Sequence, residues 1–109
     1  MGVAPFEVEV AITSRRVIVR GDLDLATSPQ LAAALEILLR DGASSVSVDM
    51  AAVSFIDSVA LSVLVDASNR LAATGGRIRV VHPSRSTTRL LQLTGLSARF
   101  AAGHPDGRS

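Results

Sequence analysis

The sequence contains no cysteine, lysine, tryptophan or tyrosine. Without cysteine the chain cannot form a disulfide framework, a thiol nucleophile or a cysteine zinc site. Without lysine it cannot supply a P-loop lysine or a Schiff base, and all eleven basic residues are arginine. The two histidines, His82 and His104, are too few to indicate a metal centre, and no nucleophile–base pair or carboxylate dyad is evident. We therefore expect no catalytic residues, no metal and no cofactor.

The net charge of +1 is unevenly distributed along the 109 residues. Residues 1–57 carry a net charge of −4, and residues 58–109 carry +5. An acidic surface that meets a basic partner is one interpretation, and two solvated faces are another. Because the sequence has no basic run and only three aromatic residues, all phenylalanine, we expect no nucleic-acid binding.

Neither the beginning of the chain nor its apolar stretches indicate a membrane protein. Residues 1–5 lack the basic segment that precedes the apolar part of a secretory signal, and acidic and polar residues interrupt every later apolar stretch. We expect no membrane association and a cytoplasmic location.

Hydrophobic periodicity predicts a mixture of strands and helices. Alternation of apolar and polar residues predicts strands at residues 6–12, 16–20, 45–50 and 77–81, with a short strand at 96–100 as an optional last element. Helical spacing predicts helices that start at Thr27, Asp57 and Ser84 as hydroxyl or carboxylate caps. Residues 21–24 are expected to form a turn, and residues 51–56 a loop.

The order of these elements is β-β-α-β-α-β-α, with the optional strand at the end. Strands separated by helices favour parallel pairing, and the first two strands favour an antiparallel hairpin. The sequence thus predicts one α/β domain over residues 6–101, with a mixed, mostly parallel sheet of four to five strands. Residues 102–109 are expected to be a disordered tail.

The start of the second helix is the candidate functional position. Asp57 is expected at the N-cap and Ser58 in the first turn, where backbone N–H groups are unpaired and the helix dipole is positive. A phosphate on Ser58 would be stabilised there by the backbone and opposed by the neighbouring Asp57. A simpler interpretation, in which both residues only cap the helix, stays open.

Four segments together resemble a known family. Residues 55–61, FIDSVAL, resemble the Asp-Ser-[Ser/Thr]-Gly-Leu signature of STAS domains, specifically of anti-sigma factor antagonists. Residues 21–24, GDLD, followed by Thr27, resemble the acidic turn before the family's first helix. Residues 74–76, TGG, and 90–96, LLQLTGL, resemble two later family segments. The resemblance extends in the same order over about residues 6–101, so it implies the STAS fold.

The resemblance also implies a function without catalysis. Such proteins bind an anti-sigma factor and so release a sigma factor, and they are monomers or weak dimers. The anti-sigma factor is a serine kinase of the histidine-kinase-like ATPase fold, and a PP2C-type phosphatase reverses its action. By this resemblance Ser58 is the phosphorylation site, and the partner-binding residues are Asp22, Asp24, Asp57, Ser58 and Val59.

Two residues depart from the family signature. Val59 stands where Ser or Thr is usual, and Ala60 stands where Gly is usual. Both changes favour an alternative function, in which the chain is a non-phosphorylated STAS scaffold subunit of a signalling or transporter complex.

Overall fold

The computed structural model describes residues 5–101. Its elements, in chain order, are β1 (Glu7–Ala11), β2 (Arg16–Leu23), α1 (Ser28–Arg40), β3 (Ser45–Ile56), α2 (Ser58–Ala72), β4 (Arg77–Val81) and α3 (Arg85–Thr94). The α/β class and the order β-β-α-β-α-β-α are those predicted from the sequence. The expected tail at residues 102–109 lies outside the described residues.

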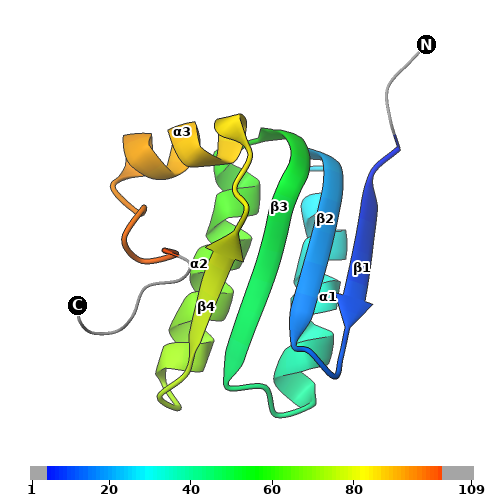
Figure 1. Cartoon of the computed structure of the whole chain (residues 1–109), viewed down its shortest axis with the longest axis vertical. Helices are drawn as coiled ribbons and strands as arrows, with labels where there is room; N and C mark the ends of the chain where they lie inside the picture. Colours follow the sequence, from blue (N-terminus) through cyan, green and yellow to red (C-terminus); the bar gives the residue numbers. More distant parts are fainter. Residues whose placement is uncertain (1–4, 102–109) are drawn as a thin grey trace.

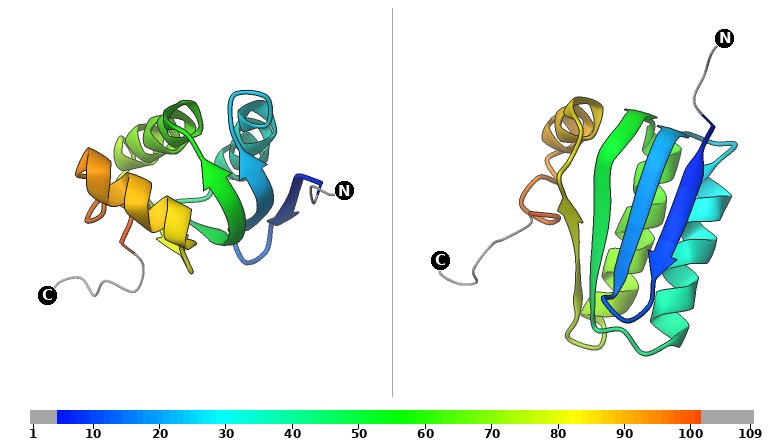
Figure 2. Two further views of the ribbon diagram at one scale, coloured as in Figure 1. Left: turned by 90° about the horizontal axis from the view of Figure 1, so that it is seen from above. Right: turned by 45° about the vertical axis from the view of Figure 1, so that its right-hand side comes forward.

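The four strands form one mixed sheet in the order β1-β2-β3-β4. β1 pairs with β2 in antiparallel orientation, whereas β2, β3 and β4 are parallel to one another. α1 and α2 lie side by side on one face of this sheet (Figures 1 and 2), and among residues 5–101 no helix covers the opposite face of β1 and β2, whereas α3 contacts β3. α3 lies beyond the carboxyl end of β4, apart from the α1–α2 layer.

The hydrophobic core lies between the sheet and the α1–α2 layer. Alternate strand residues point into it, and they meet the leucine stripes of the two helices. The largest fully buried side chains are Leu23, Leu31, Leu38, Met50, Leu64, Leu71, Ile78 and Phe100. Leu31, Leu35 and Leu38 of α1 are all buried, so the core fixes the positions of the strand ends that carry the candidate site.

β3 is longer than predicted, since residues 51–56 continue the strand and do not form a loop. The pairing with β2 shifts register twice. Ile18 pairs with Asp49 but Arg20 pairs with Ala52, and Gly21 pairs with Val53 but Asp22 pairs with Phe55. Each shift adds one residue to β3, so buried residues occur every third position, at Met50, Val53 and Ile56. This irregular spacing removes the alternation by which a strand is recognised.

The predicted strand at residues 96–100 is also wrong. This segment forms a turn beside β4, where the carbonyl oxygen of Phe100 accepts a hydrogen bond of 2.9 Å from the N–H of Val80. The Phe100 side chain is buried, whereas Leu93 of α3 is exposed. The segment is held against the domain by this backbone hydrogen bond, by the buried phenyl ring and by hydrogen bonds that Arg99 donates to Ser68 and Asn69 of α2, and not by strand pairing.

Candidate functional site

The carboxyl ends of β2 and β3 bring the predicted site residues together. Leu23 pairs with Ile56, and the N–H of Asp57 donates a hydrogen bond of 3.2 Å to the carbonyl oxygen of Leu23. The turn after β2 and the start of α2 are therefore neighbours at one edge of the sheet (Figure 1). In open α/β sheets this edge is where binding sites are usually found.

Asp57 is the N-cap of α2, as predicted. Its backbone is extended, with φ −112° and ψ 178°, and its Oδ1 accepts a hydrogen bond of 3.0 Å from the N–H of Ala60. The carbonyl oxygen of Asp57 accepts the first helical hydrogen bond, 3.0 Å from the N–H of Leu61. The first-turn N–H groups of Ser58 and Val59 are left outside the helical hydrogen-bond pattern and point towards the site.

Ser58 is exposed at the first position of α2. The two departures from the signature differ in their exposure to solvent. The Val59 side chain is 41% exposed, so its methyl groups belong to the surface around Ser58. Ala60 is fully buried, and its methyl group packs in the core. Ala60 therefore strengthens the helix without covering Ser58.

Residues 21–23, expected to form a turn, instead continue β2, so Asp22 lies on the strand and Asp24 follows its end. The two acidic residues therefore have different structural roles. Asp22 Oδ1 accepts a hydrogen bond of 3.0 Å from the hydroxyl of Ser54 on β3. Asp24 Oδ1 accepts hydrogen bonds of 3.0 Å from the N–H of Ala26 and 3.1 Å from the N–H of Thr27. The carboxylate of Asp22 thus joins two strand ends, whereas that of Asp24 closes its own turn.

The predicted capping role of Thr27 is wrong. Its hydroxyl makes no cap hydrogen bond to α1, although Thr27 occupies the N-cap position. The hydroxyl instead donates to the carbonyl oxygen of Asp22 at 2.8 Å and accepts from the N–H of Asp24 at 2.9 Å. Pro29 in the first turn of α1 supplies no N–H, so the helix needs one cap acceptor fewer and the Thr27 hydroxyl is free to hold the segment from Asp22 to Asp24.

Two exposed apolar residues at this edge were missed by the sequence analysis. Phe55 is 49% exposed and Leu25 is 70% exposed. Phe55 lies opposite Asp22 in the sheet register, after the second register shift of β3. The sequence analysis placed residues 51–56 in a loop, so it could not predict on which side of a strand Phe55 lies. With Val59 these residues give the Ser58 surface an apolar part beside its carboxylates.

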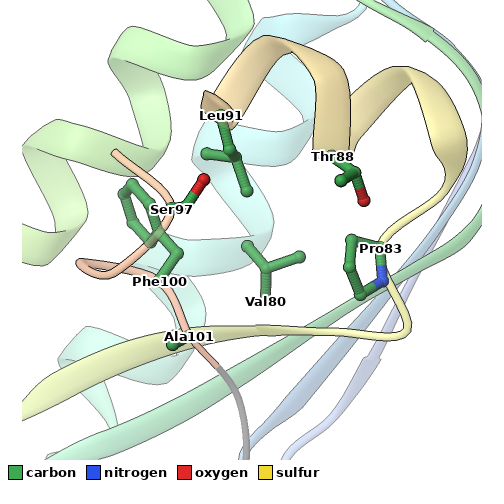
Figure 3. Close-up of a pocket in the computed structure, with 7 residues that line it drawn as sticks. All are labelled: Val80, Pro83, Thr88, Leu91, Ser97, Phe100 and Ala101. Atoms are coloured by element: carbon green, nitrogen blue, oxygen red, sulfur yellow. The ribbon is translucent and has the colours of Figure 1, made fainter. Parts of the chain in front are cut away.

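A separate hollow of about 270 Å³ lies between β4, α3 and the following turn (Figure 3). It is lined by Val80, Pro83, Thr88, Leu91, Ser97, Phe100 and Ala101. None of these residues is charged, and none belongs to the predicted site. Elsewhere within residues 5–101, no group of three or more His, Asp or Glu side chains is placed to hold a metal ion. Nor is any helix in that range long and apolar enough to cross a bilayer.

A model of the STAS domain matches residues 7–105. This chain belongs to the STAS domain family. An anti-sigma factor antagonist from Mycobacterium paratuberculosis is similar in structure, with a TM-score of 0.70 and 30% identity over 88% of this chain and 81% of that chain. The Bacillus cell fate determinant SpoIIAA in its phosphorylated form gives a TM-score of 0.65 and 26% identity, covering 87% of each chain.

The anti-sigma factor antagonist SpoIIAA in its unphosphorylated form is similar in fold, with a TM-score of 0.71 and 23% identity over 87% of this chain and 84% of that chain. No protein of curated function matches the sequence. The STAS fold expected from the sequence is thus confirmed, with structural similarity to anti-sigma factor antagonists.

Proposed function

We propose that this STAS domain is an anti-sigma factor antagonist. It binds an anti-sigma factor, so that a sigma factor is released, and phosphorylation of Ser58 switches the binding off. It performs no catalysis itself. The observation that carries the proposal is the exposed Ser58 hydroxyl, which lies between the Asp57 cap and the exposed Val59 at an edge shared with the acidic turn.

The binding surface contains both charged and apolar groups. Asp22, Asp24 and Asp57 supply carboxylates, and Phe55 and Leu25 supply exposed apolar area. A partner that fits this surface presents an apolar contact framed by arginine or lysine, because charge complementarity selects a basic rim. The expected partner is a serine kinase of the histidine-kinase-like ATPase fold, which also acts as the anti-sigma factor.

Phosphorylation changes this surface without changing the fold. A phosphate adds a charge of about −1.5 to −2 and three acceptor oxygens at Ser58. The unpaired N–H groups of the first turn and the positive end of the helix dipole accommodate it, so α2 stays folded. For a docked partner, the phosphate adds bulk and desolvation cost at the centre of the contact. A PP2C-type phosphatase would restore the free surface.

Phosphate transfer from ATP by the cognate kinase tests the acceptor, with Ser58→Ala and Ser62→Ala compared to the wild type. Ser62 is a matched control, since it is an exposed serine of the same helix. Its hydroxyl donates a hydrogen bond of 2.6 Å to the carbonyl oxygen of Val59. We expect Ser58→Ala to abolish the incorporation of phosphate and Ser62→Ala to leave it unchanged. Equal incorporation in all three proteins contradicts the assignment of Ser58.

Capture of binding proteins by the wild type and by Ser58→Asp tests the switch. We expect the wild type and Ser58→Ala to retain the kinase, and Ser58→Asp to bind it about tenfold more weakly because of the added charge. Exposed Val59, in place of a second hydroxyl, favours the scaffold alternative. That alternative predicts a partner bound equally by all three proteins.

A further inference from the structure

The open face of the sheet carries charged side chains that separate into two regions. On the β1 side, Arg20 lies between two glutamates, with its Nη1 atom 3.3 Å from Glu9 and 4.0 Å from Glu7. This part of the face is neutralised by its own ion pairs. A partner gains little there, because exposed pairs of this kind contribute weakly.

The β3–β4 side of the same face has an excess of positive charge. In the sheet register Arg16 lies opposite Ser47, Ser47 lies opposite Arg79, and Ser45 lies opposite Arg77. These five residues form what we call the arginine face. The serine side chains of the central strand are small, and Ser45 Oγ accepts a hydrogen bond of 3.3 Å from Arg79 Nη2, so the three arginine side chains stay partly exposed on this face.

One carboxylate, Asp49, lies next to the arginine face and is already engaged. Its Oδ2 atom is 2.6 Å from Arg16 Nη2 and 3.3 Å from His82 Nδ1. Within residues 5–101, no carboxylate oxygen lies within 4.0 Å of a guanidinium nitrogen of Arg77 or Arg79. The arginine face therefore keeps uncompensated positive charge.

Two hydrogen-bond donors of this face lack acceptors. The Nε atoms of Arg16 and Arg79 are both shielded from solvent without a hydrogen-bond partner among the described residues. A shielded donor without an acceptor is unfavourable, so a bound group whose oxygen atoms reach these donors would recover free energy. Guanidinium groups match carboxylates particularly well, because their parallel N–H donors engage both oxygens.

We propose that the arginine face is a second docking surface, which binds a carboxylate-rich segment of a partner protein. Its shape favours a polypeptide, since the surface is an open sheet face and small ligands are held in concave pockets (Figure 1). Half-buried Ile18 and Val81 lie on either side of Asp49 in the next row of the sheet. They offer apolar contact to the aliphatic stems of glutamate side chains.

Nucleic acid is a poorer match for the same charge. All three aromatic residues lie away from the arginine face, because Phe6 precedes β1, Phe55 lies near the end of β3 and Phe100 is buried beside β4. Bases would therefore find no ring to stack on. The inference is independent of Ser58, which lies at the carboxyl edge and belongs to a surface of opposite charge.

Fluorescence anisotropy of a labelled decaglutamate peptide tests the proposal with the full chain. The test variant is the double substitution Arg77→Glu and Arg79→Glu. Its matched control is Arg85→Glu and Arg89→Glu, which changes the net charge equally at two exposed positions of α3. We expect the test variant to bind the peptide about tenfold more weakly, whereas the control changes the affinity less than about twofold. Circular dichroism of both variants verifies their folding.

Three outcomes overturn the proposal. In the first, both double variants weaken binding equally, so that only net charge matters. In the second, neither variant weakens it. In the third, the wild type binds a ten-residue oligothymidine or phosphatidylserine vesicles more tightly than decaglutamate, which identifies a nucleic acid or a lipid surface as the preferred ligand. Ser58→Asp, measured in parallel, is expected to leave decaglutamate affinity unchanged, so failure of either proposal can be distinguished.

Discussion

The hydroxyl of Ser54 donates a hydrogen bond of 3.0 Å to Oδ1 of Asp22, and this bond joins the ends of two parallel strands beside Ser58. Both residues flank the second register shift of β3. The bond holds the exposed end of β3 against β2 at the position where Phe55 faces solvent. The geometry of the Ser58 surface thus depends on a contact that contains no residue of α2.

A double-mutant cycle measures the free energy of that contact. We expect Ser54→Ala and Asp22→Ala each to lower the free energy of unfolding, and the double variant to lose less than the sum of the two. The coupling should be about 0.5–1 kcal/mol, as is usual for a hydrogen bond at a partly exposed position. Urea unfolding provides the values. Strict additivity would show that the bond does not contribute.

The cap of α2 gives a second prediction. Asp57→Ala leaves the N–H of Ala60 without its acceptor, so it should destabilise the domain by about 1 kcal/mol. For a domain of this size that corresponds to a fall in Tm of about 4–8 °C. Asp57→Asn keeps a capping oxygen and should retain most of the stability. Thermal unfolding monitored by circular dichroism compares the two, and equal losses would refute the capping role.

The adjacent glycines before β4 provide a third, internally controlled prediction. A methyl group at Gly76 would collide with the carbonyl oxygen of Ser44, so Gly76→Ala should cost about 3 kcal/mol. A methyl group at Gly75 meets no atom within 4 Å, but φ there is +82°. Gly75→Ala should therefore cost only about 1–2 kcal/mol of backbone strain. Chemical denaturation that ranks the two variants in the opposite order would contradict the close approach.

Asp49 should make stability depend on pH. Burial alone would raise its pKa, but the N–H of Ala51 and the side chains of Arg16 and His82 together lower the pKa below the ordinary 3.8. A lowered pKa in the folded state stabilises the domain above pH 3.8, and this stabilisation is lost as the pH falls through the folded-state value.

Asp49→Asn should therefore cost about 1–2 kcal/mol near pH 7, and the difference from the wild type should shrink below about pH 4. Urea unfolding at several pH values between 2.5 and 7 measures it. Asp66→Asn, at an exposed position of α2, is the control and should change stability little at any pH. A difference that stays constant down to pH 2.5 would exclude the linkage.

Regular periodicity accounts for what could be predicted from the sequence. The limits of β4, the cap of α2 at Asp57 and the Gly95 end of α3 follow from alternation, carboxylate capping and a left-handed glycine with φ 74°. The order of the elements, and hence the α/β class, depends only on such local signals. The position of Ser58 at the start of α2 was predictable for the same reason.

The parts that were not predictable depend on pairing between distant segments. Residues 51–56 lost their strand periodicity because β2 imposes two register shifts on β3, and β2 is about thirty residues away in sequence. Likewise, the hydroxyl of Thr27 donates a hydrogen bond to the carbonyl oxygen of Asp22 near the end of β2. The exposed Phe55 and the arginine face result from this register, so neither could be found by reading one segment at a time.

The two register shifts also determine how this chain tolerates insertions and deletions. From Asp49 to Phe55, β3 advances two residues more than β2 does from Ile18 to Asp22, and these two extra residues set which side chains of the strand end face the core. Deleting one residue between Ala51 and Ser54 would move Phe55 and Ile56 by one position, which turns an apolar core residue towards solvent. A homologue that lacks such a residue must either reshape the strand end or present a different surface around its serine. Length variation in this short segment is therefore a route by which related domains can acquire different partners.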